Sequence, residues 1–88
     1  MIDFSADWCA ACKELETKTY PSPEIAAELK RFVFIKVNDR EATAVKQYGA
    51  MGLPYVVFID SQGRLLKDRT LTGFQTPHDL LPVLQHIN

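Results

Sequence analysis

The sequence predicts an α/β fold in which a mixed four-stranded sheet carries helices on both faces. Two observations support this prediction. Apolar runs typical of strands alternate with segments of helical composition, in the order strand, helix, strand, helix, strand, strand, helix. The first three of these elements also form a strand–helix–strand unit, whose strands should be parallel and joined by a right-handed connection.

The first strand and helix are predicted from the opening residues. Residues 1–5 alternate apolar and polar side chains and include β-branched and aromatic types, which favour a strand. A helix should begin at Cys9 and run to about residues 17–20. Prolines at positions 21 and 23 then interrupt regular backbone hydrogen bonding, so we expect a break there.

A second helix and strand should follow this break. Ser22 and Pro23 are typical of an N-cap and a first helical position, and the helical segment should end near Lys30. Residues 31–38 are the strongest strand signal in the chain. Their continuous apolar centre predicts that this strand is covered on both faces.

The second half of the chain repeats the alternation. Residues 41–48 have helical composition, and Gly49 is placed to end this helix in the left-handed conformation. Residues 55–59 should form a buried strand that a polar turn joins to a second strand at 64–72, giving a hairpin. The apolar side chains at helical spacing in the third helix are Ala42, Val45 and Tyr48.

A closing helix should begin after Thr76, which precedes a proline and an early acid as a cap would. Leucine, valine and isoleucine side chains between 80 and 87 form its apolar stripe. Pro82 lies within this stripe and conflicts with a straight helix, so we expect a kink or a loosened first turn.

Length and composition limit the possible classes of protein. The 88 residues support one domain, residues 1–88, and 47% hydrophobic with 24% charged residues is ordinary for a soluble globular chain. A net charge of −1 and a pI near 6.1 give no reason to expect nucleic acid as a partner. No apolar run approaches the roughly 18 residues of a membrane span, and no signal segment opens the chain.

The chemistry should centre on Cys9 and Cys12, which have two residues between them. They lie where the first strand turns into the first helix. Unpaired N–H groups and the positive end of the helix dipole would stabilise a thiolate at Cys9. Cys12, one helical turn further, is close enough to form a disulfide. We expect Cys9 to be at least partly accessible to solvent and Cys12 to be mostly buried.

Two acidic residues are candidates for a role beside this pair. Asp3 falls in a core-forming strand, where a carboxylate is costly to bury unless it functions or pairs. Strand alternation places it on the face opposite Ile2 and Phe4. Glu16 lies four residues after Cys12, on the same helical face, and both carboxylates should point toward the sulfur atoms. Asp3 could instead pair with Lys36, and Glu16 could belong to a solvated helix face.

These residues resemble a known family. Residues 6–16, with sequence ADWCAACKELE, are followed by Gly52-Leu53-Pro54 and by Thr-Gly-Phe at 72–74. This pattern resembles the thioredoxin superfamily, and within it the C-terminal periplasmic domain of DsbD-type thiol:disulfide interchange proteins. The resemblance covers essentially the whole chain. It implies that Pro54 is cis and packs beside the dithiol, where the neighbouring backbone can pair with a substrate strand.

The resemblance also implies that Asp3 and Glu16 form an acid pair beneath the dithiol, able to shuttle protons and to disfavour a thiolate by like-charge repulsion. Two departures limit it. A full thioredoxin begins with an additional strand and helix that this chain lacks. The residues between the cysteines are Ala10-Ala11, where thioredoxin has Gly-Pro, so its redox potential cannot be copied.

The predicted function is thiol:disulfide exchange through Cys9 and Cys12, as a protein-disulfide reductase in a reductive relay. Trp8, Leu53 and Pro54 would contact the substrate, and the cysteine disulfide would be the sole redox group, with no separate cofactor. We expect the partners to be protein dithiols or disulfides. We expect the domain to be a monomer, either on its own or as part of a larger membrane-anchored protein. Location in the periplasm follows from the resemblance, with the cytoplasm as the alternative.

Simpler explanations compete with this function. The chain could be a non-catalytic binding module that keeps its cysteines as a structural bridge or as inert core residues. A zinc site is disfavoured because the other candidate ligands, His78 and His86, fall on a distant helix, and we expect no metal. The aromatic residues that could be either core residues or the rim of a docking groove are Trp8, Tyr55 and Phe74.

Overall fold

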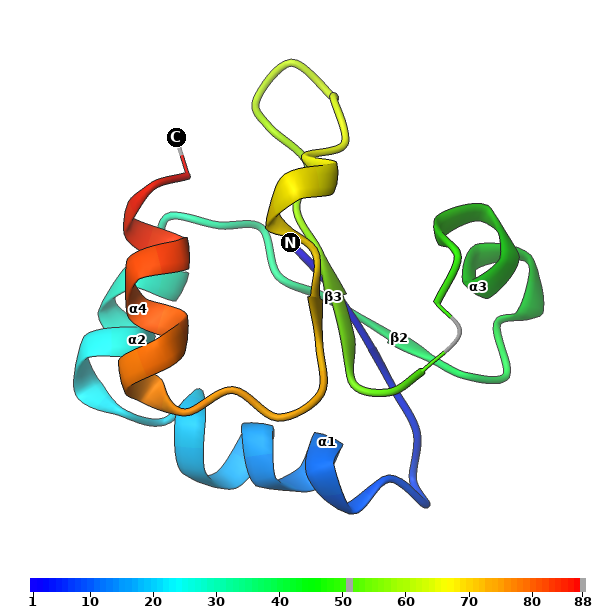
Figure 1. Ribbon diagram of the computed structural model, residues 1–88, viewed down its shortest axis with the longest axis horizontal. Helices are drawn as coiled ribbons and strands as arrows, with labels where there is room; N and C mark the ends of the chain where they lie inside the picture. Colours follow the sequence, from blue (N-terminus) through cyan, green and yellow to red (C-terminus); the bar gives the residue numbers. More distant parts are fainter. Residues whose placement is uncertain (51, 88) are drawn as a thin grey trace.

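The computed structural model describes residues 1–50 and 52–87 and contains the predicted succession of strands and helices (Figure 1). Two short helical segments, η1 and η2, are added to this succession. In chain order the elements are β1 (Ile2–Ser5), α1 (Ala10–Glu14), η1 (Leu15–Thr19), α2 (Pro23–Leu29), β2 (Ile35–Asn38), α3 (Ala42–Tyr48), β3 (Tyr55–Val57), η2 (Lys67–Arg69), β4 (Leu71–Thr72) and α4 (Pro77–Gln85).

The four strands form one mixed sheet in the order β2-β1-β3-β4. β1 pairs with β2 in parallel, so that Asp3 lies opposite Lys36. β3 runs antiparallel to β1 and places Val56 opposite Asp3 on the other side. β4 is antiparallel to β3, which confirms the predicted hairpin partners. The mixed four-stranded sheet and the order of its elements are therefore confirmed.

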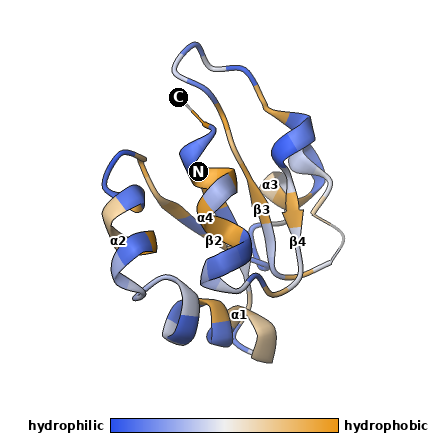
Figure 2. Ribbon diagram, turned by 60° about the vertical axis from the view of Figure 1, so that its left-hand side comes forward, coloured by the Kyte–Doolittle hydropathy of each residue, from blue (hydrophilic) through white to orange (hydrophobic). Residues whose placement is uncertain are grey.

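Helices cover both faces of the sheet, as predicted. α2 and α4 pack against each other on one face, and α3 lies on the other (Figure 1). The alternation of β1 separates two apolar clusters, because Met1 packs with α2 and α4 while Ile2 and Phe4 pack with α3. Figure 2 shows hydrophobic residues along the strands in the middle of the molecule and hydrophilic residues on much of the helices.

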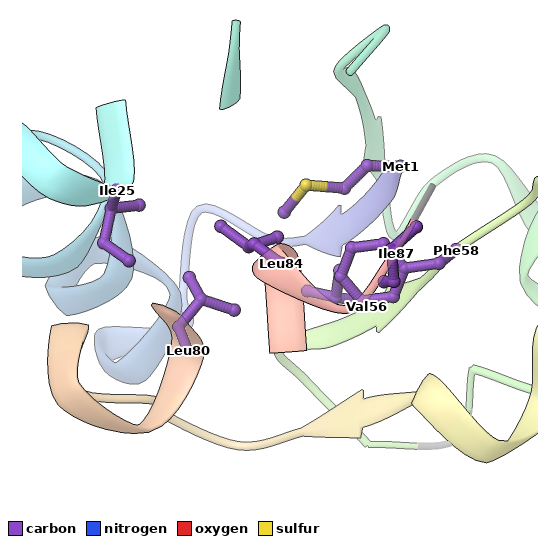
Figure 3. Close-up of a cluster of buried hydrophobic side chains, with 7 residues drawn as sticks. All are labelled: Met1, Ile25, Val56, Phe58, Leu80, Leu84 and Ile87. Carbon is purple, nitrogen blue, oxygen red and sulfur yellow. The ribbon is translucent and has the colours of Figure 1, made fainter. Parts of the chain in front are cut away.

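The larger cluster joins the two helices to the sheet (Figure 3). Helix α4 contributes Leu80 and Leu84, which are fully buried, and α2 contributes Ile25. Strand residues and the chain ends complete the cluster with Met1, Val56, Phe58 and Ile87. Close packing of these side chains fixes the position of α2 and α4 over the face that carries Asp3.

The strand predicted at 31–38 is shorter and less covered than expected. The backbone N–H groups of Arg31 and Phe32 donate to carbonyl groups at the end of α2, so this stretch closes a turn and β2 begins only at Ile35. β2 also lies at the edge of the sheet, with 78% of Val33 exposed just before it. The prediction of cover on both faces is therefore wrong, because an apolar run alone does not distinguish an edge strand from a central one.

The strand predicted at 64–72 is interrupted. Asp60 Oδ1 accepts the backbone N–H groups of Gln62 and Arg64, both at 2.9 Å, and this fixes the polar turn. After a single bridge between Ile59 and Leu65, the charged and exposed residues of η2 form a 3₁₀ turn. Pairing resumes only in the two residues of β4.

The first helix reaches the predicted region but changes type along its length. After α1, the segment η1 is a π-helix, in which the N–H of Tyr20 donates to the carbonyl of Leu15, five residues earlier, at 2.9 Å. The sequence predicted one continuous helix here.

The other helix ends largely follow the sequence. Gly49 ends α3 with φ 68°, as predicted, and Thr76 caps α4 by accepting the N–H of Asp79. Ser22 stands at the N-cap of α2, but its side chain makes no capping hydrogen bond. α4 continues through Pro82. The side chain of Ala42 lies outside the described part of the chain. None of the described helices combines the length and apolar character needed to cross a membrane.

Candidate functional site

The two cysteines form a disulfide at the start of α1. Their Cα atoms are 5.3 Å apart, which is within the usual range for a disulfide. Cys9 is the N-cap of α1, and its Sγ accepts the backbone N–H of Cys12 at 3.2 Å. The residues after β1 thus place one sulfur atom at the unpaired N–H groups of a helix, as the sequence predicted.

Both cysteines are buried in this oxidised state. The exposed fraction is 5% for Cys9 and 3% for Cys12, so the prediction of a partly accessible Cys9 is wrong for the disulfide form. The small side chains of Ala6 and Ala11, together with Leu53, pack around the pair. The capping contact also turns Cys9 Sγ toward the helix, so little of its surface is available to a partner in this state.

The loop before β3 lies beside the disulfide. The peptide bond between Leu53 and Pro54 is cis, which confirms the expectation from the family resemblance, and Pro54 is buried. Leu53 is half-buried and packs against the cysteine cluster. The carbonyl of Pro54 accepts the N–H of Gly73 at 2.9 Å, which ties this loop to the end of β4.

The three aromatic residues near the site differ in exposure. Trp8 is 73% exposed, so its interpretation as a core residue is wrong, and Phe74 is exposed as well. Tyr55 is half-buried and its ring packs edge-on against Phe4. Trp8 Nε1 donates to Asp39 Oδ2 at 2.9 Å, a contact that the sequence analysis missed. This bond joins the exposed indole to the residue that follows β2.

Asp3 is a buried carboxylate with only one hydrogen bond from the described residues. Only 2% of the residue is exposed. Its Oδ2 accepts the hydroxyl of Tyr20 at 3.1 Å, while Oδ1 has no hydrogen-bond partner in the described part of the chain. Burial raises the pKa of Asp3, and the nearby charge of Glu16 adds to the rise, whereas the Tyr20 hydrogen bond and Lys36 act to lower it. The net direction is upward.

Glu16 and Lys36 form an ion pair across the surface of η1 and β2. Lys36 lies opposite Asp3 in the strand register, but its ammonium group donates to Glu16. Pairing of Asp3 with Lys36, the alternative considered from sequence, is therefore not what the structure contains. Glu16 is connected to Asp3 through Lys36, which lies opposite Asp3 in the strand register, and the charge of Glu16 helps to raise the pKa of Asp3.

Tyr20 is the residue beside Asp3 that the sequence analysis missed. Its hydroxyl connects the end of η1 to β1, 17 residues earlier in the chain. Burial and the carboxylate of Asp3 raise the pKa of Tyr20, so the phenol keeps its proton and remains a donor. In the sequence Tyr20 only marked the end of a helix, and no pattern indicated a buried partner.

The two histidines belong to α4 and its C-terminal end. His78 and His86 are both exposed on or at the end of α4. Within residues 1–50 and 52–87, no group of three or more His, Cys, Asp or Glu side chains is arranged to hold a metal ion.

Comparison with known proteins identifies the family. The family model described as "Thioredoxin-like domain" matches residues 1–88. The chain belongs to the thioredoxin-like family. This thioredoxin-like chain is 41% identical over 92 residues to the thiol:disulfide interchange protein DsbD of Vibrio vulnificus strain CMCP6, and 34% identical to the DsbD of Haemophilus ducreyi. Both matches span 99% of this chain, which corresponds to 15% and 16% of the length of those proteins.

Solved structures agree with this assignment. The oxidised C-terminal domain of DsbD from Neisseria meningitidis superposes with a TM-score of 0.83 at 26% identity, over 99% of this chain and 78% of that one. A thioredoxin from Thermus thermophilus superposes with a TM-score of 0.82 at 20% identity, over 96% of this chain and 68% of that one, which supports the fold alone.

Proposed function

We propose that this thioredoxin-like domain is a thiol:disulfide oxidoreductase that exchanges its Cys9–Cys12 disulfide with protein partners. The observation that carries the proposal is a disulfide at the start of a helix, with the cis Leu53–Pro54 bond on one side. The names of the relatives, thiol:disulfide interchange proteins, support the same chemistry. No separate cofactor is needed, because the cysteine pair carries two electrons as the dithiol and accepts two electrons as the disulfide.

The exchange proceeds through a mixed disulfide. In the reduced domain, the Cys9 thiolate attacks a partner disulfide, which forms a bond between Cys9 and the partner and releases one partner thiolate. Cys12 then loses its proton and attacks Cys9 Sγ, which breaks the bond to the partner. The domain ends oxidised and the partner ends as a dithiol. The backbone N–H of Cys12, which contacts Cys9 Sγ at 3.2 Å, would stabilise the Cys9 thiolate.

Asp3 would take the proton that Cys12 must lose. Its Oδ1 is buried and has no hydrogen-bond partner in the described chain, so it has an acceptor site free for a proton. A pKa raised by burial brings the carboxylate closer to the range in which it can both accept and return a proton. Glu16 would act through its charge, which raises the pKa of Asp3, while Lys36 partly offsets that charge.

Substrate contact would involve Trp8, Leu53 and Pro54. Trp8, which directly precedes Cys9 in the chain, has an exposed ring, and Leu53 packs against the cysteines. We propose that a partner strand lies along this loop and that its disulfide approaches Cys9 from the same side.

We further propose the direction and location of the reaction. The domain would act as a reductase in a periplasmic relay, as a monomeric unit of a larger membrane-anchored protein with protein rather than nucleic acid partners. The support is the similarity to DsbD proteins, of whose length this chain spans about 15%.

Reduction of insulin disulfides with dithiothreitol as the electron source tests the activity. We expect the domain to accelerate insulin reduction well beyond the reagent alone, and Cys9→Ser to abolish the acceleration. Cys12→Ser should accumulate mixed disulfides through Cys9, which mass spectrometry can locate. A rate equal to that of the reagent alone would instead favour a non-catalytic binding module with a structural disulfide. Mixed disulfides found only through Cys12, in the Cys9→Ser protein, would reverse the two roles.

A further inference from the structure

We propose that Tyr20 is a positioning residue for disulfide exchange. Its hydroxyl donates a hydrogen bond to Oδ2 of Asp3, so that Oδ1 is the atom that receives the proton from Cys12. This inference rests on the proposed function. It adds a residue outside the cysteine motif and outside the acid pair to the machinery of the exchange.

The position of Tyr20 is fixed from two directions. Its backbone N–H closes the π-helical turn by donating to Leu15, whose side chain is buried. Its ring packs edge-on against Phe34, with centroids 5.3 Å apart and planes at 83°. These two contacts place the hydroxyl 3.1 Å from Asp3 Oδ2.

No other group among the described residues substitutes for this hydroxyl. The charged and titratable groups facing Asp3 are Tyr20 and Glu16 from the η1 region and Lys36 from β2, while β3 presents the apolar Val56. Glu16 can only repel the carboxylate, and the ammonium of Lys36 is taken up by Glu16. The Tyr20 hydrogen bond is therefore the direct stabilisation that the charged form of Asp3 receives within the described chain.

The proton balance of the exchange explains why this matters. The Cys12 thiol passes its proton to Asp3, which becomes a neutral acid, and the Cys12 sulfur then forms the bond to Cys9 as the partner sulfur leaves. Tyr20 keeps its own proton throughout and holds one orientation of the carboxyl group. Without the hydroxyl, the carboxylate would lose its donor, and Asp3 would stay protonated to higher pH and be a base over a narrower range.

The test is Tyr20→Phe, which removes the hydroxyl and keeps the ring against Phe34. A matched control is Tyr48→Phe, because Tyr48 also packs on β1, against Phe4, but on the face opposite Asp3. Carbon-13 NMR of the Asp3 carboxyl group in the oxidised protein gives its titration directly. We expect Tyr20→Phe to raise the pKa of Asp3 by about 1 unit or more, and Tyr48→Phe to leave it unchanged.

The second readout is the pH dependence of the Cys12 step, followed by release of a chromophoric thiol from a mixed disulfide preformed on Cys9. Raising the pKa of the base by about 1 unit should lower the rate about tenfold on the acidic limb and retain the plateau at high pH. A purely structural role would change the melting temperature without moving the limb. Replacement of Tyr20 with 3-fluorotyrosine, a more acidic donor, should shift the limb in the opposite direction.

The outcomes separate this inference from the proposed function. Shifts in both the Asp3 titration and the acidic limb for Tyr20→Phe, absent in Tyr48→Phe, support the positioning role. If the wild-type protein exchanges disulfides and the titration and rate profiles of Tyr20→Phe superimpose on those of the wild type, the Tyr20 inference alone is overturned. A wild-type protein with no exchange activity would overturn the proposed function, and the positioning role with it.

Discussion

Replacing Asp3 with Asn should increase the free energy of unfolding of the oxidised protein at neutral pH. The substitution is nearly isosteric, and the amide oxygen can still accept the Tyr20 hydroxyl that now donates to Asp3 at 3.1 Å. It removes a negative charge that is 98% buried and whose second oxygen has no hydrogen-bond partner in the described chain. The amide N–H2 that replaces Oδ1 is likewise without a partner in the described chain, so the gain comes from removing the buried charge alone, and we expect it to be on the order of 1 kcal/mol at pH 7.

The pH dependence gives this prediction a definite sign. Because burial raises the pKa of Asp3 in the folded protein above its usual value of 3.8, the folded state keeps its proton over a pH range in which the unfolded state has lost it. Stability therefore falls as the pH rises from the unfolded pKa through the folded pKa, by at most about 1.4 kcal/mol per pH unit for one group. Below the unfolded pKa both states are protonated, so the destabilisation from the buried charge is absent and the stability of the folded protein is not reduced by Asp3.

Urea denaturation of wild type and Asp3→Asn at several pH values measures the difference. The gain from the substitution should be small near pH 3 and should grow to a constant value at neutral pH. Asp60→Asn is a control of opposite sign, because backbone N–H donation from Arg64 lowers the pKa of Asp60. Its loss of stability should appear at neutral pH and disappear in acid. A stability difference for Asp3→Asn that is independent of pH, or a loss at pH 7, would refute the reasoning.

Four further substitutions test the scaffold by chemical denaturation. Leu84→Ala removes a fully buried side chain from the core between α4 and α2 and should cost about 2–5 kcal/mol. Arg31→Met should cost about 1 kcal/mol, because the half-exposed guanidinium donates to the carbonyls of Leu84 and Ile87 at the end of α4. Amide hydrogen exchange at the end of α4 should become faster in this variant. Gly49→Ala places a side chain at φ 68° and should cost about 1–2 kcal/mol, whereas Gly52→Ala, with open space and no positive φ, should change stability by less than about 0.5 kcal/mol.

The succession of elements could be predicted because each one rests on short-range chemistry. The break at two prolines, the left-handed Gly49 and the cap at Thr76 are local signals, and the structure contains all three features where they were expected. The length of the strand within residues 31–38, and how far it is covered, could not be predicted in the same way. Whether an apolar run is covered depends on its neighbours in the sheet, and β2 has a described neighbour on one side alone.

The site was predictable to the same degree. The spacing of Cys9 and Cys12 indicated a disulfide, and strand alternation separated Asp3, which contacts Tyr20, from Ile2 and Phe4, which pack with α3. The burial of Cys9 depends on the packing of Leu53 against it. The contact from Tyr20 depends on a π-helical turn. Neither feature is a local signal in the sequence. A π-helical turn has one more residue than an α-helical turn, and helix propensities do not reveal where such a residue is inserted.

The charges around Asp3 bear on its proposed role as a functional rather than a structural acid. A structural carboxylate in a core is normally paired, and the cation nearest in register, Lys36, was available for this purpose. In the structure that cation pairs with Glu16, and within residues 1–50 and 52–87 the hydrogen-bond donor to the Asp3 carboxylate is the neutral hydroxyl of Tyr20. Asp3→Asn should therefore raise stability and slow disulfide exchange at the same time, because the charge that destabilises the core is the one that would accept the proton from Cys12. A structural acid would lower stability when neutralised, and activity would change only as far as folding did.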